Sequence, residues 1–310
     1  MGLLWRPLLS ATVPIDPATG DFDWSVIPFP VFGSPKMDGF RGMIQRATLV
    51  SRNGLPVKNK ELQARFGRKE YEGLDIELTA GLPNGESVFN ATSRVVKKAD
   101  AKAEHVRANI IDFMAQKNSV PFSLEQRISV LKANYGVFQR SRGFYLIKQT
   151  LIKDVSQLKS FEASCLTDGY EGVMLRRADQ GPYPQKPGKQ NRSTLKEFYL
   201  ARLKRFETDD AVIVEYHPLE HNMNEERTAT GARSSKKAGI VVDVHRVGSV
   251  TLRDVKTGKE FDTTVGSTWL REWKGWAGAV GKTVRYRYQL IGTKDKPRIN
   301  TCSFQELDVK

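Results

Sequence analysis

The stretch SPKMDGFRGM, residues 34–43, places Lys36 between a proline and an Asp-Gly pair, and an arginine follows shortly after. Glycine and proline on both sides indicate a turn or the edge of a loop. A lysine amine becomes a nucleophile when burial or neighbouring cations lower its pKa. We expect Asp38 to orient this amine, and Gly39 to let a ligand approach the backbone. We expect Arg41 to hold a sugar hydroxyl or a phosphate oxygen.

The composition indicates a basic protein with a polyanionic partner. The chain has 310 residues and a formal charge of +14, which favours nucleic acid first and an anionic membrane second. Its apolar stretches are shorter than the roughly 18 residues of a spanning helix. The N-terminus lacks the pattern of a signal peptide, so we expect a cytoplasmic protein. Two cysteines and four histidines argue against a disulfide scaffold and a zinc cluster.

The character of the sequence changes after residue 205. Residues 1–205 mix strand-like runs with helical segments, which predicts an α+β domain. Residues 206–310 contain four or five β-branched runs with a hairpin tip at 256–259, which predicts a β-barrel, with the OB-fold as the natural candidate. An insertion at about 217–239 has no Ile, Val, Leu, Met or aromatic residue from position 224 onward. It therefore supplies no core, and we expect it to be mobile.

Local patterns predict several individual elements. Apolar and acidic residues alternate over residues 74–78, which predicts a half-buried strand. The stretch SLEQRISVLKAN, residues 123–134, combines a serine cap with apolar residues at helical spacing. Arg52-Asn53-Gly54 is a hairpin signal. The aromatic side chains expected to pack the barrel are Tyr170, Trp269, Trp273 and Trp276.

Five stretches together resemble the motifs of one enzyme family, in its order. KMDGFR, residues 36–41, is similar to the nucleophile motif of ATP-dependent DNA ligases and other covalent nucleotidyltransferases. The further stretches are Ser51-Arg52, LDIEL (74–78), DGYEGVMLR (168–176) and RSTLKEFYLARLK (192–204). GTKDKPR, residues 292–298, and RPLLSAT, residues 6–12, resemble the two ends of small viral DNA ligases. The resemblance covers essentially the whole chain. It implies a nucleotidyltransferase (adenylation) domain followed by an OB-fold, with a DNA-clamping insertion.

The resemblance implies an enzyme of DNA repair or replication that seals nicks with 5′-phosphate and 3′-hydroxyl ends. It implies ATP, Mg²⁺ or Mn²⁺, nicked duplex DNA as partner, no membrane and a monomeric state. Lys36 would attack the α-phosphate of ATP to form lysyl-AMP. AMP would then pass to the 5′-phosphate, and the 3′-hydroxyl would displace it.

The resemblance also implies a role for each motif residue. The catalytic set is Lys36, Asp38, Glu77, Glu171, Arg202 and Lys204, with Asp38 and Glu171 as metal ligands. The nucleotide-binding set is Lys36, Arg41, Glu77, Ile111, Met174, Arg202, Lys204, Lys294, Asp295 and Arg298. The DNA-binding set is Arg41, Arg52, Arg192, Arg227, Arg233, Lys236 and Lys237. Glu77 and Arg41 would bind the ribose, Met174 would cover adenine, and the last three nucleotide-binding residues would orient pyrophosphate.

Three positions depart from the family pattern. Ile76 replaces a glycine between Asp75 and Glu77. Arg202 replaces a lysine, and arginine does not readily give up a proton. Ile111 stands where the family has an adenine-stacking aromatic residue, so Phe113 is an alternative for that contact.

Two other classes of function share these features. An RNA ligase or an mRNA capping guanylyltransferase has the same nucleophile motif. A basic OB-type nucleic-acid-binding protein with an inactive N-terminal half is the non-enzymatic alternative. An NAD-dependent ligase is disfavoured, because that class carries a four-cysteine zinc module.

Overall fold

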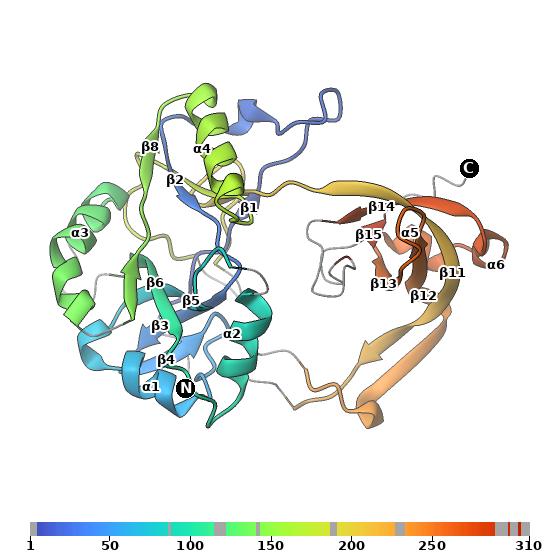
Figure 1. Ribbon diagram of the computed structural model, residues 1–310, viewed down its shortest axis with the longest axis horizontal. Coiled ribbons are helices and arrows are strands. Elements are labelled where there is room, and N and C mark those ends of the chain that lie inside the picture. Colours follow the sequence, from blue (N-terminus) through green and yellow to red (C-terminus); the bar gives the residue numbers. More distant parts are fainter. Residues whose placement is uncertain are drawn as a thin grey trace. The chain divides into compact units, whose positions relative to one another are not determined.

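The chain divides into two compact units, and the boundary along the chain falls between Lys204 and Arg205 (Figure 1). The computed structural model describes residues 5–85, 88–114, 122–140, 143–186, 191–226, 233–288, 297 and 303–304. Two five-stranded sheets form the first unit, and a closed barrel forms the second. Within these described residues, no helix combines the length and the apolar character needed to cross a bilayer.

The first sheet of the N-terminal unit has the strand order β1-β10-β9-β2-β8. Its strands are β1 (Ala11–Thr12), β2 (Val31–Pro35), β8 (Thr150–Ile152), β9 (Val173–Arg177) and β10 (Ala201–Leu203). Helix α4 (Val155–Thr167) packs against this sheet through Leu158 and Cys165. The Asp154 side chain caps α4 by accepting a hydrogen bond from the Gln157 amide.

The second sheet has the order β4-β3-β5-β6-β7. Its strands are β3 (Phe40–Gln45), β4 (Thr48–Ser51), β5 (Leu74–Ala80), β6 (Val106–Phe113) and β7 (Phe144–Leu146). The helices beside it are α1 (Lys60–Phe66), α2 (Val88–Lys97) and α3 (Leu124–Arg140). Ser123 and Gln126 exchange hydrogen bonds at the start of α3. This capping box confirms the predicted helix.

The turn between β3 and β4 carries no turn signal in the sequence and was not predicted. The turn residues are Arg46 and Ala47, which both have positive φ angles, of 54° and 53°. The Glu72 carboxylate accepts hydrogen bonds from both of their amides, at 2.6 and 2.9 Å. This distant partner stabilises a turn that normally needs glycine or asparagine. The predicted hairpin signal Arg52-Asn53-Gly54 forms a tight turn after β4, with Gly54 at φ +81° and an antiparallel bridge between Val50 and Pro56 across it, which confirms it.

Strand β5 contains the alternating residues 74–78, but it is covered on both faces. Leu74, Ile76 and Leu78 belong to the core beside the helices. Asp75, on the opposite face, has 0% exposure. The prediction of a strand is confirmed, and the prediction that one face meets solvent is wrong. Ile76 replaces the family glycine without steric conflict, because its side chain enters the core on the other face.

The second unit is a five-stranded barrel with the order β11-β12-β13-β15-β14. Its strands are β11 (Glu207–Asn222), β12 (Ile240–Asp254), β13 (Glu260–Val265), β14 (Thr283–Tyr288) and β15 (Ser303–Phe304). Helices α5 (Thr268–Glu272) and α6 (Trp276–Ala279) lie between β13 and β14 in the sequence. Strands β12 and β13 pair antiparallel on either side of residues 256–259, which confirms the predicted hairpin tip. The predicted α+β fold with an OB-type barrel is confirmed.

Part of the predicted insertion is a two-stranded arm, with register shifts on either side of Pro218. Strands β11 and β12 continue past the barrel and pair as far as Asn222 and Ile240 (Figure 1). Residues 217–222 therefore belong to β11 and are not part of a loop. Beyond the arm, the Met223 amide donates to the Gly239 carbonyl and the Ser234 amide to the Glu226 carbonyl.

The aromatic residues assigned to barrel packing divide into three groups. Trp276 is buried in the barrel core and Trp273 packs against it. Trp269 is 64% exposed and stacks on Trp273 with ring centroids 6.5 Å apart. Tyr170 packs in the first unit against the core beneath α4. The assignment is therefore wrong for Trp269 and Tyr170.

Candidate active site

The nucleophile motif passes from one sheet of the N-terminal unit to the other. Lys36 directly follows β2, and Arg41 lies in β3 of the second sheet. A Cβ on Gly39 would lie 2.4 Å from the Leu78 carbonyl oxygen. The glycine is thus required for the close approach of this segment to β5. Gly39 also lines the cavity described below, so the expectation that it lets a ligand approach the backbone stays a prediction.

Lys36 contacts Glu171, a distant residue of the predicted catalytic set, and through Glu171 it is linked to a second one, Lys204. Its ammonium group is hydrogen-bonded to one carboxylate oxygen of Glu171, and the Lys204 ammonium to the other. Backbone hydrogen bonds join the Lys36 amide to the Gly172 carbonyl at 2.8 Å and the Glu171 amide to the Lys36 carbonyl at 3.1 Å. A Cβ on Gly172 would lie 2.2 Å from the Leu203 carbonyl oxygen, so β9 and β10 approach closely here. These contacts bring three separate motifs together.

Electrostatics within this triad favour the charged carboxylate. Burial alone would raise the pKa of Glu171, but the Lys36 and Lys204 ammonium groups lower it below its ordinary value. Burial lowers the pKa of Lys204, and the positive charge of Lys36 acts in the same direction. A carboxylate shared by two lysines therefore stays ionised and fixes both amines.

A cavity of about 500 Å³ opens next to Lys36. Its lining includes the predicted metal ligand Asp38 and most of the predicted nucleotide- and DNA-binding residues of the first unit: Lys36, Arg41, Arg52, Glu77, Ile111, Met174, Arg192 and Arg202. Glu171, which contacts Lys36, and Lys204, which contacts Glu171, are not among the lining residues. The volume lies within the range of small-ligand sites.

Arg41, which lines the cavity, is hydrogen-bonded to the buried carboxylate of Asp75. Its Nε and Nη2 atoms donate to the two oxygens of Asp75 at 2.5 and 2.7 Å. Burial alone would lower the pKa of Arg41, but the charge and hydrogen bonds of Asp75 raise it above its ordinary value. A bidentate pair of this kind fixes the plane of the guanidinium group. Arg41 therefore enters the cavity with a defined orientation.

Glu77 lines the cavity, and its pKa is raised toward neutral pH. It pairs with Arg41 across β3 and β5 and is partly buried. Burial raises its pKa to about 7, although Arg41 and Lys36 act against this. Glu77 is therefore able to accept or donate a hydrogen bond near neutral pH.

The apolar part of the lining shows which side chains are available to contact an adenine in place of the family's aromatic residue. Ile111 and Met174 both line the cavity. Phe113 packs against the core of the second sheet and Phe122, so it does not replace Ile111. Phe89 of α2 also lines the cavity. It has no motif around it, which is why reasoning from the sequence did not select it.

Three of the predicted DNA- and nucleotide-binding arginines form another part of the lining. Arg192 donates to the Ser10 carbonyl oxygen at 3.1 Å, and Arg202 donates to the Thr12 hydroxyl at 3.0 Å. Burial and the charge of Arg192 lower the pKa of Arg202. Arg52 is exposed at the end of β4. Together they form a cationic region of the cavity wall.

The remaining predicted residues lie elsewhere. Arg233, Lys236 and Lys237 belong to the second unit, where Lys236 is ion-paired with Glu226 at 2.5 Å. Arg227, Lys294, Asp295 and Arg298 lie outside the described residues. Within the described part of the chain, no group of three His, Cys, Asp or Glu side chains is arranged to hold a metal ion.

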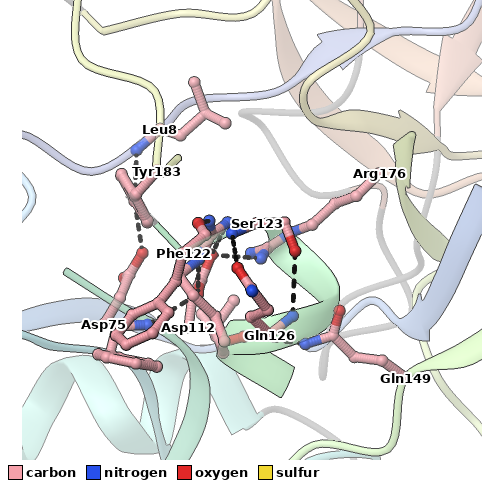
Figure 2. A network of polar contacts seen from close by, with 12 residues as sticks. Leu8, Asp75, Asp112, Phe122, Ser123, Gln126, Gln149, Arg176 and Tyr183 are labelled. Carbon is pink, nitrogen blue, oxygen red and sulfur yellow. Dashed lines mark hydrogen bonds and ion pairs between the residues drawn. The ribbon is translucent and has the colours of Figure 1, made fainter. Parts of the chain in front are cut away.

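A buried polar network behind the cavity was not predicted. Figure 2 shows Asp112 of β6 beside Arg176, and Tyr183 beside Asp75. Asp112 accepts hydrogen bonds from Arg127 at 2.8 Å and from Arg176 at 2.6 Å. Arg127 lies on the face of α3 that also presents Leu124, Ile128 and Leu131 to the core. The sequence signal that could have revealed this network is an arginine on the apolar face of a predicted helix.

Several solved structures that are similar to this chain are DNA ligases. The chain is similar to a Lig E DNA ligase, with a TM-score of 0.66 and 18% identity over 97% of this chain and 99% of that one. It is similar to Chlorella virus DNA ligase-adenylate, with a TM-score of 0.53 and 21% identity over 97% and 98% of the two chains. Comparisons with protein-family models and with curated proteins give no match.

The architecture and these similarities define a class of fold. The chain has the fold of the ATP-dependent DNA ligases, a nucleotidyltransferase unit followed by an OB-type barrel. The resemblance drawn from the sequence motifs is thus confirmed at the level of the fold.

Proposed function

We propose that this protein is an ATP-dependent DNA ligase that seals nicks in duplex DNA through a lysyl-AMP intermediate. The main support is that Lys36 and Lys204 both hydrogen-bond to the Glu171 carboxylate beside a cavity lined by the other nucleotide-binding motifs. Residues from three separate motifs thus meet at one carboxylate in a fold shared with DNA ligases. A surface lysine with no function would not need these partners.

In the first step the Lys36 amine attacks the α-phosphorus of ATP. A nitrogen–phosphorus bond forms, the bond to pyrophosphate breaks, and the amine releases its proton to solvent. Glu171 orients the amine before the reaction. Lys204 and Arg202 stabilise the negative charge that develops on the α-phosphate.

Different residues of the cavity wall bind the nucleotide and the nick. Arg41 and Glu77 bind the ribose hydroxyls, and Met174 and Ile111 cover the faces of the adenine. A second set holds the 5′-phosphate of the nick: Arg52 and Arg192. Lys294, Asp295 and Arg298 would orient pyrophosphate, and the cations of the insertion would contact DNA phosphates.

The chemistry of the site fits a magnesium ion bound together with ATP. Mg²⁺ is usually held by one or two carboxylates plus substrate phosphates. Asp38 and Glu171 provide such oxygen atoms. When bound, the ion would neutralise charge on the transferred phosphate. Manganese would suit the same oxygen ligands.

The test is the formation of a covalent protein–nucleotide adduct. Incubation with α-labelled ATP and Mg²⁺ should label the protein, and a singly nicked duplex should then be sealed. Lys36→Ala should abolish the adduct while leaving the fold intact. The control Lys60→Ala, which changes a lysine whose side chain is 76% exposed, should label normally. Labelling by GTP instead would indicate a capping enzyme, sealing of RNA alone an RNA ligase, and the lack of any adduct a non-enzymatic protein.

A further inference from the structure

Tyr183 joins the nucleotide cavity to the N-terminal segment of the chain. Its hydroxyl donates to Oδ2 of Asp75 at 2.7 Å and accepts from the Leu8 amide at 2.9 Å. The side chain is buried, and its ring lies edge-on to Trp5 with centroids 5.4 Å apart. Figure 2 shows the hydroxyl between Leu8 and Asp75.

The N-terminal strap, defined as residues 5–10, forms part of the cavity wall from Arg6 onward. Apart from Tyr183, it is held by the Gln45 side chain, which donates to the Trp5 carbonyl at 2.8 Å. Asn191 accepts from the Leu9 amide through its backbone carbonyl oxygen, at 2.8 Å. The strap and Arg41 are therefore connected through one hydroxyl group and one carboxylate.

Arg41 depends on Asp75 for its orientation in the cavity. Its Nε and Nη2 atoms both face the Asp75 carboxylate. Oδ2 of Asp75 accepts from both Arg41 and Tyr183. Removal of the Tyr183 hydroxyl would free the carboxylate to rotate, and Arg41 would rotate with it.

We propose that Tyr183 is a positioning residue for nucleotide binding, which acts by fixing Asp75 and thereby the guanidinium group of Arg41. This inference rests on the proposed function, because it takes ATP as the ligand that Arg41 contacts. Tyr183 is not among the lining residues of the cavity, so we expect its effect on the ligand to pass through Asp75 and Arg41. Burial and the charge of Asp75 raise the pKa of Tyr183 well above its ordinary value, so its proton stays in the bond to Asp75.

The test is single-turnover adenylylation of Tyr183→Phe over a range of ATP concentrations. The half-saturating ATP concentration should rise about tenfold, and the maximal rate should change less than about threefold, because ATP binding is weakened and the nucleophile is unaffected. A purely structural defect would lower the fraction of protein that reacts and leave the half-saturating concentration unchanged.

A matched control is available in the barrel. The Tyr286 hydroxyl donates to Oδ2 of Asp254 at 2.8 Å, and both residues are buried. Tyr286→Phe removes the same kind of hydrogen bond in the other unit. It should leave the half-saturating ATP concentration unchanged.

A double-mutant cycle tests whether the effect passes through Arg41. Arg41→Lys cannot form the bidentate pair with Asp75. In that background, Tyr183→Phe should raise the half-saturating concentration less than about twofold further. Parental ATP dependence in Tyr183→Phe, or effects that multiply in the double variant, would overturn the inference and leave the proposed function in place. If the parent protein forms no adduct, the proposed function fails, and this inference fails with it.

Discussion

Replacement of Asp112 by asparagine should destabilise the N-terminal unit by about 3–5 kcal/mol, because it leaves buried charges without a partner. The side chains of Asp112 and Arg127 are only 2% and 1% exposed, and that of Arg176 is 7% exposed. Burial alone would raise the pKa of Asp112, but the two arginines lower it, so the carboxylate is ionised at neutral pH. Asparagine keeps the shape and removes the charge. Two buried guanidinium groups would then face a neutral amide.

The destabilisation should be measured by hydrogen exchange of the β6 and α3 amides. A global unfolding curve would mix the two units, which need not unfold together. The control is Glu260→Gln, which breaks the Arg253–Glu260 pair of the barrel, 2.9 Å apart and about half exposed. It should cost less than about 1 kcal/mol. If Asp112→Asn also costs less than about 1 kcal/mol, the network is not a buried charge cluster and the reasoning fails.

Three further results are expected. Burial raises the pKa of Glu77 from 4.5 to about 7, so the folded protein keeps a proton that the unfolded chain releases, and its stability falls as pH rises through this range. Glu77→Gln should therefore stabilise the unit at pH 8 by at most about 3 kcal/mol and have no such effect at pH 4, measured by exchange of β5 amides; equal effects at both pH values would contradict this. Arg202→Lys should retain most adenylylation activity and Arg202→Ala should lose at least about tenfold, as expected for one interaction with a phosphate; an unchanged rate for the alanine variant would make Arg202 a surface charge. Replacement of Arg233, Lys236 and Lys237 by alanine should leave adenylylation normal and make the slope of log affinity against log salt shallower by about 0.9 for each phosphate that is no longer neutralised; a parental slope would show that these cations do not bind DNA.

The elements that were predicted correctly are those determined by nearby residues. The α3 helix carries its capping signal within four residues, Ser123 to Gln126. The hairpin at 256–259 has Gly258 at φ +69°, as the turn requires. The β3–β4 turn was missed because Glu72, which stabilises it, lies 25 and 26 positions away. A local pattern carries no information about such a partner.

The candidate site shows the same distinction. Motif order and spacing led to Lys36, Glu171 and Lys204, which the structure brings into contact. The supporting residues were missed, because Asp75 resembled a solvated strand residue and Tyr183 had no pattern around it. Their importance depends on burial and on partners 34 and 108 positions away. Burial of that kind arises only when the two sheets pack together.

The cations around the cavity differ in their partners: some are paired with carboxylates and others are bonded to neutral oxygen atoms. The motifs did not reveal this difference. Lys36, Arg41 and Arg176 each face a buried carboxylate, from Glu171, Asp75 and Asp112 respectively. Arg192 and Arg202 instead donate to neutral oxygen atoms, those of Ser10 and Thr12. A cation paired with a carboxylate is fixed in orientation, but its charge is largely cancelled at a distance. A cation bonded to a neutral oxygen keeps its charge for an incoming anion. The first set is thus suited to orienting the reacting groups, and the second to attracting a phosphate into the cavity.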